Sequence, residues 1–333
     1  MIDTLVDADC ADEGEGIGPV ILIGGPTASG KSRLAMRLAD EVGGVIVNAD
    51  SMQVYADLAI LTARPTPEDE ARCQHHLFGF LDAATPCSAG LWHRRARSIC
   101  QEISSTGRVP IVVGGTGLYL RTFREGLAPI PDIPGDVRER VRQRLAIEGA
   151  EALHADLGGI DPSLAAVLSP ADSQRIARAH EVHEATGTRL SEWMTRAREG
   201  GWKGALWQIS LLPDRSLLFE RAVARFDRMM AAGALEEAAA FAARRLDSSL
   251  PATRCVGLAS LTAHLAGRLT LDEACDEAKR ATRRYARRQF TWFRHQSGDA
   301  SLLCAFGDDE SAGDIVARAR CFLSSSSAHV PCP

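Results

Sequence analysis

The segment at residues 20–38 constrains the fold of this chain more than any other. An apolar run leads into a glycine-rich turn that ends in Gly30-Lys31-Ser32, and an amphipathic stretch follows directly. A strand, such a loop and a helix in this order predict a phosphate-binding loop, because backbone N–H groups and the helix N-terminus point into one concavity. The residues expected to hold a diphosphate or triphosphate are Gly25, Pro26, Thr27, Ala28, Ser29, Gly30, Lys31 and Ser32. Lys31 would add a positive charge, and the Ser32 hydroxyl is a candidate Mg2+ ligand.

The size and composition of the chain favour a two-domain cytoplasmic protein. It has 333 residues, 45% of them hydrophobic, which is enough for a large core. Its nine cysteines include no C-x-x-C pair, so neither a zinc site nor a disulfide framework is indicated, and reduced thiols are expected. The acidic N-terminus lacks the apolar stretch of a secretory signal, and no run is long enough for a transmembrane helix.

The distribution of charge indicates a polyanionic partner although the net charge is −5. Residues 1–18 contain six acids and no base, and residues 299–333 sum to −3, which leaves +4 for residues 19–298. The stretch from Lys279 to Arg294 has seven basic residues, no acid and interleaved aromatic residues. Solvated helix faces usually mix charges of both signs, so this stretch favours contact with a phosphate backbone.

Strand and helix signals alternate along the chain. Apolar runs at 20–24, 44–48, 109–113 and 205–212 predict buried strands, so we expect an α/β fold: a P-loop NTPase-like, doubly wound parallel sheet. The catalytic core would comprise 19–134 and 204–300. Residues 135–203 have helical patterning without strand signals and predict an all-helical insertion domain. Residues 1–18 read as a disordered acidic leader and residues 301–333 as a loose C-terminal tail.

Within the predicted insertion, one helix has explicit start and stop signals. Ser169-Pro170-Ala171-Asp172 is typical of a capping box with proline at the first helical position. Gly187 is expected to end that helix.

Two polar residues follow predicted strands and are candidates for chemistry. Asp50 follows the strand at 44–48, and Thr116 lies in the glycine-rich turn Gly114-Gly115-Thr116-Gly117 after the strand at 109–113. This third strand has no carboxylate at its end, so the usual Mg2+-binding Asp of a P-loop NTPase is missing there. Asp50 suits a general base, with a turn or helix-capping role as the alternative. Thr116 could contact an oxyanion or an amine, or simply form a tight turn.

An ordered series of motifs extends this interpretation from residue 20 to residue 295. It begins with Gly25-Pro-Thr-Ala-Ser-Gly-Lys-Ser32, Asp50-Ser51-Met52-Gln53-Val54-Tyr55, Thr62-Ala63-Arg64-Pro65, His75-His76-Leu77 and Val113-Gly-Gly-Thr-Gly-Leu-Tyr119. It continues with Asp161-Pro162, Gln174-Arg175-x-x-Arg178-Ala179-x-Glu181-Val182, Arg225-Phe226-x-x-Met229 and Thr282-Arg283-x-Tyr285-Ala286-x-Arg288-Gln289-x-Thr291-Trp292-Phe293-Arg294. In this series the chain resembles the bacterial tRNA dimethylallyltransferase family.

The resemblance implies transfer of a dimethylallyl group from its diphosphate to the N6 amine of adenosine 37, 3′ of the anticodon, with Mg2+ as cofactor. The loop and Arg225 would then bind the donor diphosphate, Asp50 would be the general base, and Thr116 would position the leaving group or the amine. The tRNA contacts expected from the resemblance and the basic stretch are Asp50, Ser51, Met52, Gln53, Thr116, Arg138, Gln174, Arg175, Ile176, Ala177, Arg178, Arg254, Cys255, Val256, Gly257, Leu258, Arg283 and Arg287.

The expected partners are dimethylallyl diphosphate and the anticodon stem-loop of tRNA, which the helical insertion would grip by shape and phosphates. We expect a monomer without a membrane partner. Some positions depart from the family pattern: Gly257-Leu258-Ala259-Ser260 replaces Gly-Tyr-Lys-Glu, and His180 replaces a leucine. These changes are expected to affect substrate range more than reaction type. The alternatives are a small-molecule P-loop kinase, an adenylate isopentenyltransferase and a non-catalytic RNA-binding module.

Overall fold

The computed structural model describes residues 17–308 and 312–327. The chain divides into two compact units, one of which is Glu125–Gly201, and the other contains the described residues before and after it. The second unit begins earlier than the predicted insertion because Leu127 and Glu199 pair where the chain leaves and re-enters the first unit, with N···O distances of 2.9 and 2.8 Å. The predicted acidic leader lies, apart from residues 17 and 18, outside the described residues.

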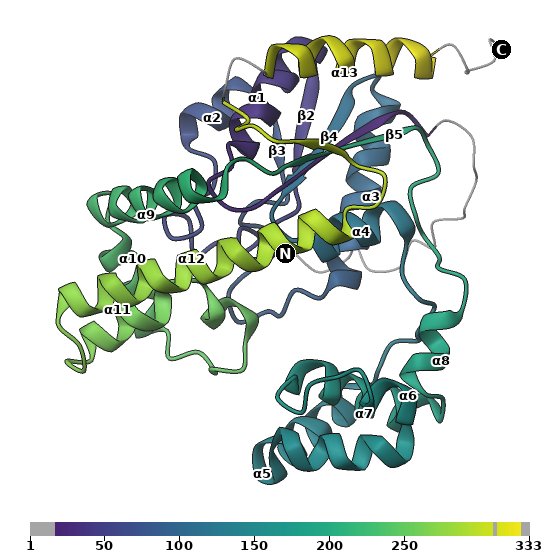
Figure 1. Cartoon of the computed structure of the whole chain (residues 1–333), viewed down its shortest axis with the longest axis vertical. Coiled ribbons are helices and arrows are strands. Elements are labelled where there is room, and N and C mark those ends of the chain that lie inside the picture. Colours follow the sequence, from purple (N-terminus) through teal and green to yellow (C-terminus); the bar gives the residue numbers. More distant parts are fainter. Residues whose placement is uncertain (1–16, 309–311, 328–333) are drawn as a thin grey trace, which may run out of the picture. The chain divides into compact units, whose positions relative to one another are not determined.

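The first unit is built on a six-stranded sheet (Figure 1). Its strands are β1 (Val20–Gly24), β2 (Gly44–Asn48), β3 (His75–His76), β4 (Val109–Gly114), β5 (Leu206–Leu211) and β6 (Ser301–Leu303). Their order is β3-β2-β4-β1-β5-β6, and every neighbouring pair is parallel. The predicted α/β class, with a P-loop NTPase-like parallel sheet, is confirmed.

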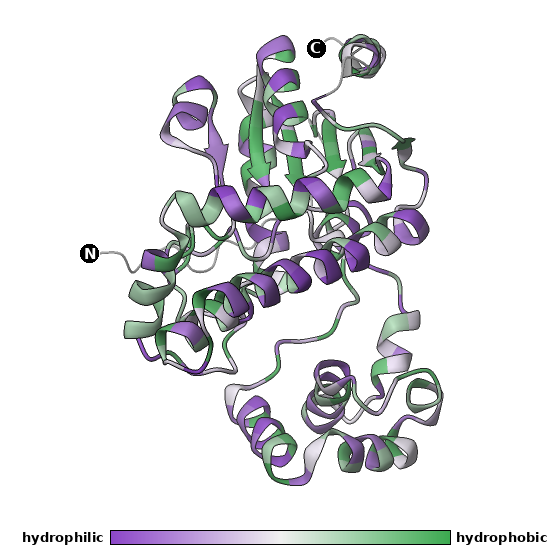
Figure 2. Ribbon diagram, turned by 60° about the vertical axis from the view of Figure 1, so that its left-hand side comes forward, coloured by the Kyte–Doolittle hydropathy of each residue, from purple (hydrophilic) through white to green (hydrophobic). Residues whose placement is uncertain are grey.

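Helices cover both faces of this sheet. The described helices of this unit are α1 (Lys31–Val42), α2 (Pro67–Arg72), α3 (Ala89–Ser105), α4 (Gly117–Glu125), α9 (Arg215–Ala231), α10 (Ala234–Ala243), α11 (Leu258–Leu265), α12 (Leu271–Gln296) and α13 (Ala312–Ser327), with a short 3-10 helix at Pro251–Arg254. Of these, α10 and α11 pack against other helices. Successive strand residues point to opposite faces. Leu22 of β1 therefore joins a hydrophobic cluster with Trp92 of α3 and Phe293 of α12, whereas Ile23 joins one with Leu34 of α1. The strands form the hydrophobic interior in Figure 2.

The C-terminal part of the first unit corrects the sequence analysis. The predicted loose tail at 301–333 contains a sheet strand, β6, and a helix, α13, which packs against α1. Ile315, Val316 and Ala319 of α13 are buried in the cluster on the α1 face. The serine-rich end of this segment hid the helical spacing of these three apolar residues. Residues 309–311 and 328–333 of the predicted tail lie outside the described residues.

The second unit contains α5 (Gly135–Ile160), α6 (Pro162–Ala165), α7 (Ser173–Thr186) and α8 (Leu190–Thr195). Gly149, with φ 84° and ψ 166°, interrupts α5 and lets its two halves change direction. Buried Asp161 ties three segments together by accepting hydrogen bonds from the Ser191 amide at 2.9 Å, the Ser191 hydroxyl at 2.8 Å and the Leu164 amide at 3.2 Å. This unit therefore has its own hydrophobic core and its own buried hydrogen-bond network around Asp161.

The predicted capping box at Ser169 is wrong. Helix α7 starts four residues later, and its N-cap is Asp172, whose side chain accepts from the Arg175 amide. Ser169 instead closes a local turn by accepting from the Ala171 amide at 3.3 Å. Gly187 does end α7, with a left-handed φ of 68°.

Within the described ranges, no helix combines the length and apolar character needed to cross a membrane.

Candidate functional site

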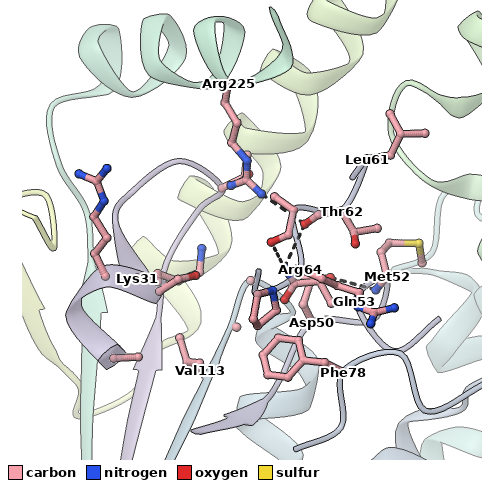
Figure 3. Close-up of a pocket in the computed structure, with 18 of the residues that line it drawn as sticks. Lys31, Asp50, Met52, Gln53, Leu61, Thr62, Arg64, Phe78, Val113 and Arg225 are labelled. Carbon is pink, nitrogen blue, oxygen red and sulfur yellow. Dashed lines mark hydrogen bonds between the residues drawn. The ribbon is translucent and has the colours of Figure 1, made fainter. Parts of the chain in front are cut away.

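A cavity of about 860 Å3 lies at the carboxyl ends of the sheet strands in the first unit. Its walls come from the start of α1, the turns after β2 and β4, the loop at 61–66, the inner faces of α9 and α12, and Gly307 with Asp308. Figure 3 shows Lys31 and Arg225 reaching toward it from α1 and α9, with Asp50 and Gln53 at the end of β2. Ligands bind at this edge of parallel α/β sheets, so the cavity is the candidate active site.

The phosphate loop forms one wall of the cavity. Thr27, Lys31 and Ser32 line it, and Gly25, Pro26, Ala28, Ser29 and Gly30 form the turn behind them. Gly30 precedes α1 with φ 85°, and a Cβ atom there would lie 2.7 Å from the Gly307 nitrogen. Gly307 in turn donates its N–H to the Ser29 carbonyl at 2.9 Å. The C-terminal segment therefore supports the loop from behind, which the sequence analysis did not anticipate.

Two cations lie beside the loop. Lys31 Nζ donates to the Pro26 carbonyl at 2.8 Å, and Arg225 donates to Thr27 Oγ1 at 3.2 Å and to the Thr62 carbonyl at 3.3 Å. Burial and the charge of Arg225 lower the pKa of Lys31 to about 7, although the charge of Asp50 acts in the opposite direction. Burial also lowers the pKa of Arg225. Neither cation forms an ion pair within the described part of the chain, so a bound anion would relieve both desolvation and repulsion.

Asp50 is held in place from both sides. Its amide donates to Asn48 Oδ1 at 2.8 Å, and its Oδ1 accepts from the Met52 amide at 2.9 Å. The second contact is the turn role that the sequence analysis gave as the alternative to a general base. Asp50 Oδ2 has no hydrogen-bond partner among the described residues, and a Cβ atom on Gly115 would lie 3.3 Å from it. One carboxylate oxygen thus fixes the turn, and the other is available in the cavity as a proton acceptor.

Thr116 interacts with the turn after β2. Its hydroxyl accepts from the Ser51 amide at 2.9 Å and lies 3.2 Å from Ser51 Oγ, while its own amide donates to the Ala49 carbonyl. Ser51, Met52 and Gln53 line the cavity. The predicted pair Asp50 and Thr116 is therefore brought together, and Thr116 acts on the cavity through Ser51.

Sequence analysis missed the part played by Gln289 in this site. Its side chain is 7% exposed and contacts two loops of the cavity wall: Oε1 accepts from the Thr27 amide at 2.8 Å, and Nε2 donates to the Gly115 carbonyl at 2.9 Å. It also missed Glu237 of α10, whose carboxylate accepts from the amides of residues 59–61 at 2.7 to 2.8 Å and so fixes the loop that precedes Thr62. The motif that contains Gln289 does not reveal these contacts, and no pattern marks Glu237, because the partners of both residues are far away in the chain.

Apart from Asp50, Ser51, Met52, Gln53 and Thr116, described above, the predicted tRNA contacts of the first unit fall into three groups. Arg254, Cys255 and Val256 line the cavity. Arg283 and Arg287 are exposed on α12. Leu258, in contrast, is 2% exposed and belongs to the core, with Gly257 at φ 90° before it, so only its backbone could reach a ligand.

The remaining predicted contacts belong to the second unit. Arg138, Gln174 and Arg175 are exposed, Ala177 and Arg178 are half-buried, and Ile176 is buried in the core of that unit. His180, the other departure from the family pattern, is also buried and contacts the Leu153 carbonyl at 2.9 Å through Nε2. The departures at Leu258 and His180 are thus core replacements.

The cavity can accommodate Mg2+ at Ser32. This residue is exposed at the first turn of α1, lines the cavity, and its hydroxyl has no protein partner among the described residues. Those residues contain no cluster of three His, Cys, Asp or Glu side chains that could hold a metal alone. Mg2+ commonly binds through few protein ligands together with water and substrate phosphates, so a hydroxyl beside a phosphate loop fits it.

Comparisons with known proteins identify the family of this chain. A family model described as IPP transferase matches residues 53–296, and one described as isopentenyl transferase matches residues 18–77. The tRNA dimethylallyltransferase of Parvibaculum lavamentivorans is 53% identical over 85% of this chain and 90% of its own length. That of Nitrobacter hamburgensis is 50% identical over 84% and 89%.

Solved structures show the same likeness. The full-length tRNA isopentenylpyrophosphate transferase from Bacillus halodurans matches with a TM-score of 0.67 and 31% identity, over 94% of this chain and 98% of that one. A eukaryotic dimethylallyltransferase acting on tRNA matches with a TM-score of 0.77 and 26% identity, over 91% and 77%.

Proposed function

Because this chain belongs to the IPP transferase family of tRNA dimethylallyltransferases, we propose that its cavity is the site of a prenyl transfer to tRNA. The chain transfers a dimethylallyl group from dimethylallyl diphosphate to the N6 amine of adenosine 37, giving N6-(dimethylallyl)adenosine and diphosphate. The observation that supports this site most directly is a phosphate loop with two desolvated cations in the same cavity as the carboxylate of Asp50.

The donor diphosphate binds against the loop. Amides at the start of α1, Lys31 and Arg225 neutralise its charge, and they stabilise it further as negative charge accumulates on the leaving oxygen. The apolar part of the donor then lies toward the hydrophobic lining, which includes Leu61, Phe78 and Val113 (Figure 3). This arrangement directs the reactive carbon away from the loop and toward the acceptor.

The acceptor adenine faces Asp50. The N6 lone pair forms the new bond to C1 of the dimethylallyl group, the C1–O bond breaks, and its electron pair leaves with the diphosphate. Asp50 Oδ2 accepts the proton that N6 loses, since Oδ1 is engaged with the Met52 amide. Ser51, which Thr116 holds in place, provides a hydroxyl next to Asp50 in the chain. The target base has to leave its stack to enter the cavity.

Ser32 would hold Mg2+ through its hydroxyl, and the ion would supply positive charge that stabilises the leaving group. Lys31, beside Ser32 at the same end of α1, supplies an ammonium group that donor binding keeps charged.

The tRNA binds through two kinds of surface in this proposal. Exposed Arg283 and Arg287 on α12 contact phosphates of the backbone. In the second unit, exposed Arg138, Gln174 and Arg175 contact the anticodon arm, whose shape and phosphates they can recognise without reading a duplex sequence. We propose that the chain acts as a monomer, since the described cavity residues named here all come from one copy.

A direct assay tests the proposal. Purified chain is incubated with dimethylallyl diphosphate, Mg2+ and either tRNA or AMP, and the digested products are analysed for N6-(dimethylallyl)adenosine. We expect the modified nucleoside from tRNA and not from AMP. Product from AMP alone would favour an adenylate isopentenyltransferase, and absence of product from both acceptors would refute the proposed function. Asp50→Ala is the matched inactive control.

A further inference from the structure

The side chain of Gln289 is the link between the two halves of the candidate site. Its amide oxygen accepts from Thr27 on the donor side, and its amide nitrogen donates to the Gly115 carbonyl on the acceptor side, beside Asp50. Thr27 and Gly115 are otherwise on separate connections, one after β1 and one after β4. A single planar amide therefore spans the gap across which the dimethylallyl group has to move.

The turn after β4 is shaped to receive this helix. A Cβ atom on Gly115 would lie 2.3 Å from Gln289 Nε2, and one on Gly117 would lie 2.2 Å from the Trp292 ring. These two glycines let α12 approach the backbone of the turn, so that Gln289 reaches the Gly115 carbonyl directly.

The chemistry of the amide group makes this link specific. Gln289 is buried, and both ends of its side-chain amide are used, one as acceptor and one as donor. An apolar residue of similar shape would leave the Thr27 amide and the Gly115 carbonyl without these partners. A glutamate would keep the acceptor for Thr27 but would place a negative oxygen against the Gly115 carbonyl unless it were protonated.

Resting on the proposed function, we propose that Gln289 is a positioning residue that sets the spacing between the donor loop and the Asp50 side of the cavity. Transfer requires the reacting carbon and nitrogen to come within about 3 to 3.5 Å, and displacement by about 1 Å can reduce the rate roughly 100-fold. A residue that fixes the two loops relative to each other acts on this distance without touching either reacting atom. Its loss should lower kcat more than it weakens binding of either substrate.

Two variants of Gln289 test this role. Gln289→Met should lower kcat about 10- to 100-fold, while the KM for donor and the Kd for tRNA change by less than about threefold. Gln289→Glu should show a pH profile that no purely structural defect produces. Its kcat relative to wild type should rise as pH falls from 8 to 6, because the protonated carboxyl can again donate to the Gly115 carbonyl.

The matched control is Ser297→Ala. Ser297 is also buried at the end of α12, its hydroxyl lies 3.1 Å from Ser210 Oγ on β5, and neither serine lines the cavity. We expect this variant to lose stability without a fall in kcat. A kcat within threefold of wild type for folded Gln289→Met would overturn the inference, as would a flat pH ratio for Gln289→Glu. If Gln289→Met does not fold, the pH dependence of kcat for Gln289→Glu relative to wild type tests the inference alone.

Hydrogen exchange separates this inference from the proposed function. The Thr27 amide should be protected in the wild type and exchange faster in Gln289→Met, whether or not the chain modifies tRNA. If the wild type lacks activity on tRNA, the proposed function fails, and Thr27 exchange still tests the link. Equal protection of Thr27 in both proteins would show that Gln289 does not hold the donor loop.

Discussion

Donor binding should take up a proton at Lys31. In the ligand-free cavity, burial and the neighbouring Arg225 lower the pKa of Lys31 to about 7. A diphosphate beside the ammonium group favours its charged form, so binding should return the pKa toward its ordinary value of 10.5. At pH 7.5 roughly a quarter of Lys31 is charged before binding and nearly all of it afterwards. About three-quarters of a proton is therefore taken up for each donor bound.

The same linkage sets the pH dependence of affinity. Between pH 7.5 and 9.0 the charged fraction of free Lys31 falls from roughly a quarter to about 1%, so donor affinity should fall roughly 20-fold. The donor does not itself cause this change, because the second ionisation of a phosphate group, near pH 6, is complete over this range. Stability of the ligand-free chain changes in the opposite direction. The unfolded state binds more protons at Lys31 between about pH 7 and 10.5, so this residue makes the fold more stable as pH rises there.

Calorimetry in two buffers of different ionisation enthalpy measures the proton uptake directly. Lys31→Met should abolish it. The matched control is Lys279→Met, since Lys279 is paired with Asp227 at 2.6 Å, and this contact raises its pKa. Lys279 therefore stays charged throughout, and its loss should leave the uptake unchanged. Absence of uptake in the wild type, or equal uptake in Lys31→Met, would refute the reasoning.

Three further outcomes follow from the site. Asp50→Asn should lower single-turnover rates by about 100- to 10,000-fold with tRNA affinity nearly unchanged, and an equal loss in both would remove the base role. Replacing Arg283 and Arg287 by Ala should weaken tRNA binding and reduce the slope of log affinity against log salt by roughly 2; an unchanged slope in filter binding would contradict phosphate contact. Gly30→Ala should cost about 1 to 3 kcal/mol of stability in chemical denaturation, since φ is 85° and Gly307 blocks the new Cβ; wild-type stability would contradict that strain.

The features that could be predicted from sequence are local ones. The phosphate loop and the strands at β1, β2, β4 and β5 have signals within a few residues, and Asp50 follows its strand directly. The parallel order of those strands then places Asp50 and the loop at one edge of the sheet.

The features that sequence analysis missed depend on distant partners. Thr27 and Gln289 are 262 positions apart, and no periodicity connects them. Helix α13 was mistaken for a loose tail because composition outweighed the spacing of three apolar residues. The Ser169 cap was wrong because a proline after a serine also suits a turn, and Asp172 was the stronger cap for the following helix.

The hydrogen bond from Gly307 to the Ser29 carbonyl has a consequence for biosynthesis. The ribosome makes the phosphate loop nearly three hundred residues before it makes Gly307. A nascent chain therefore has the complete loop sequence long before it has the strand β6 and the turn that support that loop. The support of the donor loop should form only after residue 307 has been made, and premature termination after α12 should yield a chain with most of this core but a weakened donor site.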